Sequence, residues 1–125
     1  MTLVDSCGWL EYFLDGDLAD VFAKHLAAPD LIVPTVVFYE VYKVIKRDVS
    51  ADAAERAAVT LKTKRLLPLT EDEALLAADL CLEHRLAMAD AIVYATAQMH
   101  EATLVTSDFH FAGMMGVEYL GPEHA

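Results

Sequence analysis

Four acidic residues in unusually apolar stretches of the chain are the best candidates for chemistry. They are Asp5 after "TLV", Glu40 within "VVFYEVYKVI", Asp90 within "LAMADAIVYATAQM" and Asp108 after "LVTS". An unpaired carboxylate removed from water costs several kcal/mol or takes up a proton. Four converging carboxylates would repel one another unless a cation lay between them, and hard divalent cations prefer several such oxygens. The set therefore predicts a divalent-cation site with Asp90 among its ligands.

Each of these acids also has an ordinary structural explanation. Asp5 and Asp108 would each suit the N-cap of the helix or turn that follows. Glu40 would suit the exposed stripe of a helix, and Asp90 would favour the dipole of a first helical turn. No single acid indicates a site, so the prediction of metal binding depends on the convergence of all four.

Other types of site fit the sequence less well. A receiver domain would need an acidic pair after the first strand and a lysine after a late strand, where this chain has "VDSCG" and "VTSDF". A haloacid-dehalogenase-type phosphatase would need a second Asp at the position of Cys7. The chain has no P-loop, and its five histidines lack the spacing of zinc ligands. Nothing near Cys7 supplies the base that a thiol nucleophile requires.

The elements that must position these acids alternate between strands and helices. Periodicity and turn signals predict strands at 2–4, 31–35, 65–69, 102–106 and 117–120, and helices at 8–14, 18–27, 36–47, 51–64, 70–85 and 88–101. Thr35 is expected to cap the third helix. The alternation predicts one α/β domain over residues 1–125, a sandwich around a mainly parallel sheet. Ligand sites of such sheets lie beyond the carboxyl ends of the strands, where Asp5 and Asp108 would share an edge.

Composition excludes several classes of protein. The hydrophobic fraction of 56% and the length of 125 residues indicate a globular chain with a core rather than a disordered one. No apolar run is long enough to cross a membrane, so we expect no membrane partner. The N-terminal segment carries acids and no basic region, which argues against a signal peptide. We therefore expect a cytoplasmic protein in which Cys7 and Cys81 are reduced.

The charge of the chain is strongly polarised. The formal net charge is −11, yet seven of the nine basic residues fall between residues 43 and 65, together with only three acids. A protein of this overall charge would repel nucleic acid, because binding to it is driven by neutralisation of phosphates. The basic window is the one region suited to phosphate contacts, although a solvated pair of helices would show the same pattern.

Four segments in this order resemble the PIN domain and, within it, the VapC-type toxins. They are "LVDSCGWLEY", "VPTVVFYEV", "LAMADAIVYATA" and "LVTSDFHF", and the resemblance covers nearly the whole chain. It implies a PIN-like α/β/α sandwich and a ribonuclease that depends on Mg²⁺ or Mn²⁺. The resemblance further implies a homodimer that is neutralised by a cognate antitoxin encoded beside it. The residues it assigns are the catalytic acids Asp5, Glu40, Asp90 and Asp108, the metal ligands Asp5 and Asp90, and a supporting hydroxyl from Ser6 or Thr106.

One position departs from this pattern. Some relatives carry a further acid shortly after the last one, whereas His110 occupies that place here. The departure argues against a fully formed second metal site but does not affect the first.

The basic window is expected to hold the RNA. Lys43, Lys46 and Arg47 follow Glu40 by three, six and seven residues on the same helix, so some of them should lie at the rim of the site. Lys62, Lys64 and Arg65 would extend this basic track, unless the surface serves the antitoxin instead. Two other functions are also compatible with the sequence: a PIN-like module that binds RNA or protein without cleavage, and a receiver-like signalling domain.

Overall fold

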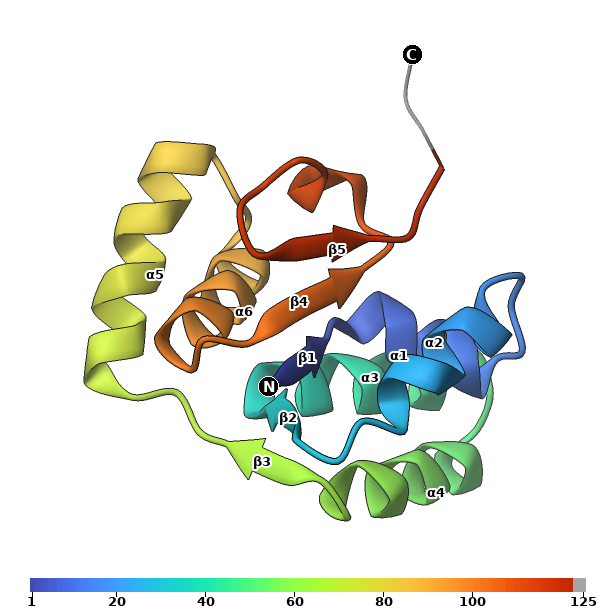
Figure 1. Ribbon diagram of the computed structural model, residues 1–125. Coiled ribbons are helices and arrows are strands. Elements are labelled where there is room, and N and C mark those ends of the chain that lie inside the picture. Colours follow the sequence, from blue (N-terminus) through green and yellow to red (C-terminus); the bar gives the residue numbers. More distant parts are fainter. Residues whose placement is uncertain (123–125) are drawn as a thin grey trace.

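A five-stranded sheet forms the centre of the structure, a computed structural model that describes residues 1–122 (Figure 1). Its strands are β1 (Thr2–Val4), β2 (Leu31–Pro34), β3 (Arg65–Leu67), β4 (Thr103–Thr106) and β5 (Val117–Tyr119). They lie in the order β3-β2-β1-β4-β5, and all four pairings are parallel. The predicted α/β sandwich with a mainly parallel sheet is confirmed. The predicted domain limit at residue 125 lies outside the described residues.

Helices connect the strands in pairs. They are α1 (Ser6–Phe13), α2 (Ala19–Leu26), α3 (Thr35–Asp48), α4 (Ala51–Lys62), α5 (Glu71–His84) and α6 (Met88–Met99), with a short 3-10 helix η1 (Phe109–Phe111) between β4 and β5. In Figure 1, α5 and α6 lie to the left of the sheet and α1 to α4 lie to the right. Right-handed crossovers explain why the helices divide between the two faces of the sheet. The chain crosses the sheet in one direction from β1 to β3 and in the opposite direction from β3 to β4, so the helices of the second crossover lie on the opposite face.

Two helix starts differ in how well the sequence predicted them. The capping-box form of "TEDE" at residues 70–73 predicts Thr70 as the cap of α5. This is confirmed, since its hydroxyl oxygen accepts a hydrogen bond from the backbone N–H of Glu73 at 3.2 Å. The prediction that Thr35 caps α3 is wrong: the N-cap is Pro34, and Thr35 is already the first helical residue. The reason is that β2 runs directly into α3, so that Pro34 ends the strand in an extended conformation and leaves no linking residue.

The third strand is shorter than predicted. It ends at Leu67 rather than at residue 69. Pro68 follows directly, and proline has no N–H to donate to the ladder of a sheet. The segment from Pro68 to Thr70 therefore leaves the sheet and leads into α5.

The hydrophobic core lies on both faces of the three central strands. Leu3, Val33 and Leu104 are fully buried, one from each of β1, β2 and β4. Gly8 allows α1 to lie close against this core, because a Cβ atom there would come within 2.5 Å of Val4 and 2.6 Å of Phe22. The first turn of α1 is thus held firmly over the end of β1, next to Asp5. No helix among the described residues is long and apolar enough to cross a membrane.

Candidate active site

The candidate site lies where β1 and β4 end side by side. This is the switch point of the sheet, since the connection from β1 leads toward β2 and β3 while β4 and β5 lie on the other side. In open α/β sheets ligands bind beyond the carboxyl ends of the strands at such a point. The two strand ends are joined directly: the Thr106 hydroxyl donates a hydrogen bond of 3.1 Å to Oδ2 of Asp5, and the backbone N–H of Asp5 donates one of 3.1 Å to the carbonyl of Val105.

Asp5 forms the floor of the site. It is only 3% exposed, and its Oδ1 accepts a hydrogen bond of 2.8 Å from the backbone N–H of Ser6 as the N-cap of α1. Burial raises the pKa of Asp5 to about 6; hydrogen bonds from Ser6 and Thr106 lower it, and the charges of Glu40 and Asp108 raise it. The predicted role as a cap and the predicted place in an acid cluster therefore both hold for this residue.

Glu40 and Asp90 face Asp5 from two helices. Glu40 lies on α3, and burial raises its pKa, as do the charges of Asp90 and Asp108, whereas a hydrogen bond with the Ser6 side chain lowers it. Asp90 lies in the first turn of α6, and burial raises its pKa to about 6, with further increases from the charges of Asp5 and Asp108. These mutual effects are those of carboxyl groups gathered in one place.

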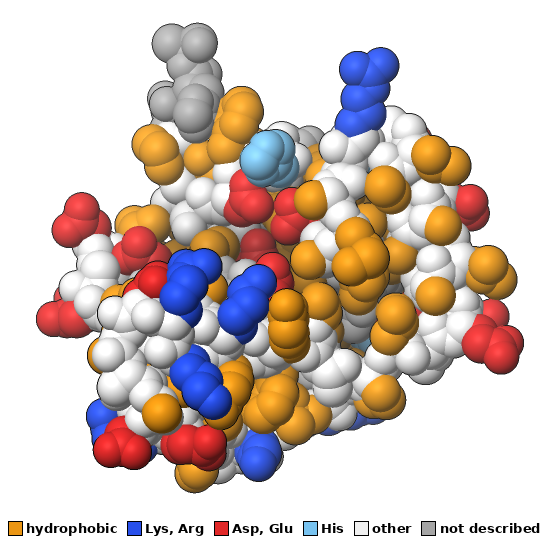
Figure 2. All heavy atoms as spheres, turned by 180° about the vertical axis from the view of Figure 1, so that it is seen from behind, with side chains coloured by type: hydrophobic (Ala, Val, Ile, Leu, Met, Phe, Trp, Pro, Cys, Tyr) orange, Lys and Arg blue, Asp and Glu red, His pale blue; other side chains and the backbone are white. Residues whose placement is uncertain are grey.

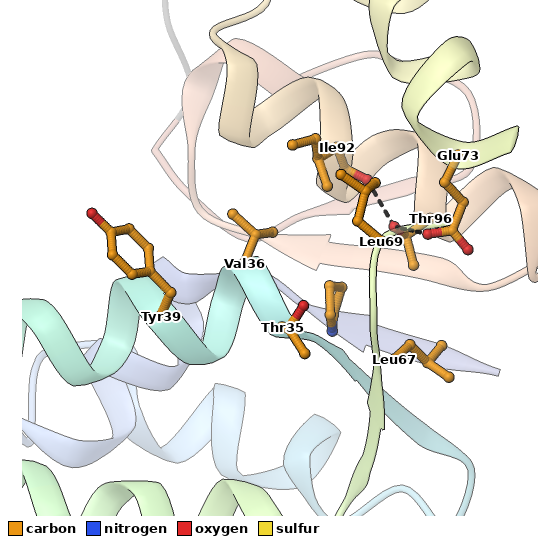
Figure 3. Close-up of a pocket in the computed structure, with 9 residues that line it drawn as sticks. Thr35, Val36, Tyr39, Leu67, Leu69, Glu73, Ile92 and Thr96 are labelled. Carbon is orange, nitrogen blue, oxygen red and sulfur yellow. Dashed lines mark hydrogen bonds between the residues drawn. The ribbon is translucent and has the colours of Figure 1, made fainter. Parts of the chain in front are cut away.

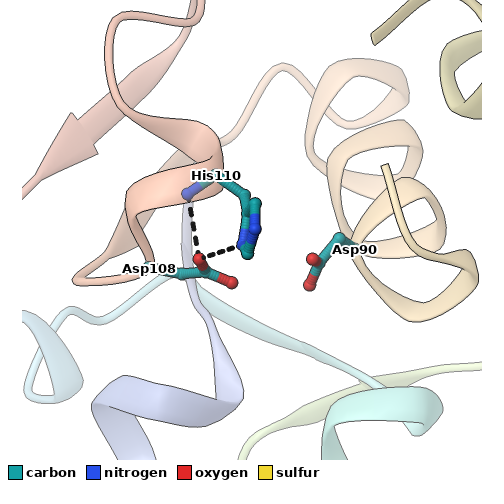
Figure 4. A group of neighbouring side chains, drawn as sticks. All are labelled: Asp90, Asp108 and His110. Carbon is teal, nitrogen blue, oxygen red and sulfur yellow. Dashed lines mark hydrogen bonds and ion pairs between the residues drawn. The ribbon is translucent and has the colours of Figure 1, made fainter. Parts of the chain in front are cut away.

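Asp108 completes the cluster and carries His110 with it. Its backbone N–H donates to the Thr106 hydroxyl at 2.9 Å, which ties Asp108 to the end of β4. Its Oδ1 accepts a hydrogen bond of 2.9 Å from the backbone N–H of His110 and lies 2.8 Å from the Nδ1 atom of the same residue. Figure 4 shows the imidazole between Asp108 and Asp90, with Asp90 facing it across a gap.

The structure thus brings all four predicted acids together from four elements. The arrangement suits a divalent cation, because the donors are carboxylate oxygens whose pKa values at Asp5, Glu40 and Asp90 rise through burial and mutual repulsion. A cation among them would relieve that repulsion, and oxygen-rich sites are those that Mg²⁺ and Mn²⁺ prefer. The site residues and the ion fit one another.

Two hydroxyl groups support the acids. Ser6 bonds to Glu40, and Thr106 lies between Asp5 and Asp108, so both predicted supporting hydroxyls lie in the cluster. From the sequence, Cys7 was considered only as a nucleophile and rejected. Its position beside the acid cluster was missed: Sγ lies 3.3 Å from the Thr106 hydroxyl. Burial raises the pKa of the Cys7 thiol, as does the charge of Asp5, so the group is held as a neutral thiol rather than as a nucleophile.

The basic residues are placed less uniformly than the sequence predicted. Figure 2 shows acidic side chains in a hollow beneath a histidine, with basic side chains beside it. Lys43 is close enough to act electrostatically on Glu40 and lies over the Tyr39 ring, 4.9 Å from its centroid. Lys46 lies over a different ring, that of Tyr42. Arg47 makes two hydrogen bonds, of 2.7 and 2.9 Å, to the neighbouring Asp48.

The expected extension of the basic track is wrong. Lys62, Lys64 and Arg65 come at the end of α4 and the start of β3. Because β3 is parallel to β2, the start of β3 lies at the opposite edge of the sheet from the strand ends that carry the acids. Within the basic window, it is Lys43 on α3 whose charge acts on the acid cluster.

A cavity of about 260 Å³ lies beside the site, between α3, α6 and the segment that joins β3 to α5 (Figure 3). Most of its lining is apolar, as at Val36 and Ile92. Its carboxylate, Glu73, is 4% exposed and is bonded through one oxygen to the Thr96 hydroxyl and through the other to His100, both at 3.3 Å. Both oxygens are engaged in joining α5 to α6, so this carboxylate is separate from the acid cluster.

Fold and site together define an α/β protein with an acidic centre at the switch point of a parallel sheet. The chain matches the PIN domain family over residues 2–115 and belongs to that family. The resemblance noted in the sequence is confirmed. The receiver-like alternative is wrong, since receiver domains have the strand order 2-1-3-4-5 rather than the order found here.

Several solved structures share this fold. A toxin–antitoxin complex from Klebsiella pneumoniae contains a chain that is 27% identical, with a TM-score of 0.82 over 94% of this chain and 96% of that one. The Mycobacterium tuberculosis toxin VapC20, described as cleaving the sarcin–ricin loop, is 20% identical, with a TM-score of 0.74 over 90% and 92%. FitAcB from Neisseria gonorrhoeae is 22% identical, with a TM-score of 0.71 over 94% and 96%. No curated protein matches the chain.

Proposed function

We propose that this protein, as one PIN domain of residues 1–125, is a metal-dependent endoribonuclease and the toxin of a type II toxin–antitoxin pair. The observation that carries the proposal is the convergence of four carboxyl groups at the switch point of a PIN fold. Hydrolysis of a phosphodiester needs a centre that offsets negative charge on the phosphoryl group and activates water. An acid cluster provides this only when it holds a divalent cation.

The residues divide this task among them. Asp5 and Asp90 hold Mg²⁺ or Mn²⁺, and Glu40 and Asp108 complete the acidic pocket. Such an ion, when bound, polarises the phosphoryl oxygen and lowers the pKa of a water molecule. Asp108 uses Oδ1 for both contacts with His110, which leaves Oδ2 to orient the attacking water and accept its proton. Thr106 fixes Asp5 and Asp108 relative to each other.

The substrate is RNA, and α3 holds its backbone. Lys43 is the foremost phosphate contact because it is exposed and near Glu40. Lys46 follows one turn further along the same helix. Arg47 contributes less, since its guanidinium is already paired with Asp48. Support for RNA as the substrate comes from the description of the similar Mycobacterium toxin as cleaving the sarcin–ricin loop.

The partners are an antitoxin and a second copy of the chain. A toxin–antitoxin complex is among the most similar structures, and its matching chain aligns over nearly the full length of both proteins. Exposed aromatic side chains suit such interfaces. Tyr12 and Tyr39 are 43% and 58% exposed, whereas Trp9 is buried in the core. Both cysteines are free, in agreement with action in the reducing cytoplasm, where RNA is found.

Cleavage of a defined RNA by the purified protein tests the proposal. We expect turnover with Mg²⁺ or Mn²⁺ and none with EDTA. Asp5→Asn and Asp90→Asn should each reduce the rate about 100-fold or more, because loss of a ligand should cost at least as much as the 10–100-fold seen when groups around the ligands are changed. Asp79→Asn, at an exposed acid on α5, is the matched control and should cleave normally. RNA binding without metal-dependent turnover would contradict the proposal and support a PIN-like binding module instead.

A further inference from the structure

We infer that His110 is a nitrogen ligand of the metal centre, and that it shifts the preference of the site from Mg²⁺ toward first-row transition ions such as Mn²⁺. The inference rests on the proposed metal-dependent function and concerns which ion that site takes. It starts from three side chains on two separate elements, Asp90 on α6 and Asp108 and His110 at η1.

The positions of these side chains fit an ion held between His110 and Asp90, with Asp108 holding the imidazole in place. One carboxylate oxygen from each of Asp90 and Asp108 and one ring nitrogen of His110 all lie within 4.8 Å of one another. Around an octahedral ion with bonds of about 2.1 Å, neighbouring ligand atoms are about 3 Å apart and opposite ones about 4 Å apart. His110 and Asp90 therefore need only small side-chain rotations to share one ion, while Asp108, which contacts Nδ1 on the other side of the ring, stays outside the ligand set.

The imidazole is held by Asp108 rather than by packing. The side chain of His110 is 74% exposed, yet its backbone N–H and its Nδ1 atom both contact Oδ1 of Asp108. Histidines that bind metals characteristically donate one ring N–H to a carboxylate, which fixes the ring and leaves the other nitrogen for the metal. With Nδ1–H donating to Asp108, the lone pair of Nε2 is the one available to an ion between His110 and Asp90.

A nitrogen ligand changes which ion the site prefers. Mg²⁺ binds almost entirely through oxygen, whereas first-row transition ions accept imidazole together with carboxylates. In a site made of acids alone, Mg²⁺ and Mn²⁺ would compete for the same carboxylate oxygens. His110 replaces an oxygen with nitrogen at this one position, and Mn²⁺ is the transition ion that also suits the remaining carboxylates.

Pulsed EPR of the Mn²⁺-loaded protein tests this directly. We expect modulation from a directly bound ¹⁴N nucleus in the wild-type protein and its loss in His110→Asp, which substitutes an oxygen ligand at an exposed position. Calorimetric titration should show that the ratio of Mn²⁺ to Mg²⁺ affinity falls about tenfold in His110→Asp. His84→Gln is the matched control, since His84 also lies beside a carboxylate, 3.8 Å from Glu83, but outside the site.

Two results would overturn the inference. In the first, the wild-type protein binds Mn²⁺ and Asp90→Asn does not, but the bound Mn²⁺ shows no ¹⁴N coupling. In the second, the ¹⁴N coupling persists in His110→Asp. His110→Gln serves as a second variant if His110→Asp does not fold. The outcomes separate the two proposals: RNA cleavage without nitrogen coupling refutes the ligand assignment alone, whereas coupling without cleavage refutes the nuclease function alone. Absence of metal binding refutes both.

Discussion

Removing the charge of Asp5 should stabilise the metal-free protein, and only above a certain pH. The variant Asp5→Asn keeps an oxygen that can accept the hydrogen bond from the backbone of Ser6. It also keeps the size of the side chain, so that the packing of α1 over β1 is preserved. What it removes is a buried carboxylate that faces Glu40 and Asp108.

The size of the effect follows from the pKa of Asp5. Burial raises this pKa from its usual 3.8 to about 6. The folded protein therefore binds more protons than the unfolded chain between about pH 4 and pH 6, and its stability falls as the pH rises through that window. This difference in pKa corresponds to about 3 kcal/mol, which is the upper limit of the stability that the charge of Asp5 alone costs the wild-type protein by pH 8.

Urea unfolding in EDTA at pH values from 4 to 8 measures this loss. At pH 4 the wild-type protein and Asp5→Asn should differ little, whereas at pH 8 the variant should be more stable by up to about 3 kcal/mol. Mn²⁺ should then stabilise the wild-type protein and have little effect on the variant, because the ion binds only the folded site. Asp79→Asn should behave as the wild type throughout. Parallel pH profiles for the wild type and Asp5→Asn would refute the reasoning.

The other predictions concern metal, RNA, thiol and assembly. Glu40→Gln should abolish most RNA cleavage and weaken stabilisation by Mn²⁺ in thermal unfolding. Lys43→Glu should weaken RNA binding and reduce the salt slope of binding by about 0.7. Arg47→Glu should change the slope less, because Arg47 is paired with Asp48. Equal effects of the two variants in filter binding would contradict the assignment of Lys43 as the foremost phosphate contact. Cys7→Ser should leave cleavage rates almost unchanged, since the mechanism uses no thiolate. Sedimentation at micromolar concentration should show a dimer, and a monomer would count against the proposed homodimer.

Strand and acid positions were largely readable from the sequence. Asp5 stands directly after β1 and Asp108 two residues after the end of β4, and the carboxyl ends of parallel strands share an edge, so their proximity could be predicted. The spatial order of the strands could not be predicted, because it depends on how the helical connections between strands, which are similar in length, pack on the sheet. The cap at Thr35 was mispredicted because the sequence gives no sign that β2 and α3 adjoin without a linker.

Side-chain pairing was the part that the sequence did not reveal. Helical spacing placed Arg47 on the same side as Glu40, but it could not show that the guanidinium would bond to Asp48. His110 was interpreted only as a missing acid. The signal for its position was its spacing of two residues from Asp108, which becomes informative once the segment is known to form a 3-10 turn that brings the ring back to the carboxylate.

The hydrogen bond between Thr106 and Asp5 joins residues 101 positions apart, and this affects when activity can arise during synthesis. A chain interrupted before β4 already contains Asp5, Glu40 and Asp90, but it lacks Asp108 and the strand that pairs with β1. At about 5–20 residues per second, translation reaches these parts several seconds or more after it has made Asp5. The growing chain therefore carries no assembled acid cluster before residue 108 is made, and the proposed nuclease activity cannot arise earlier.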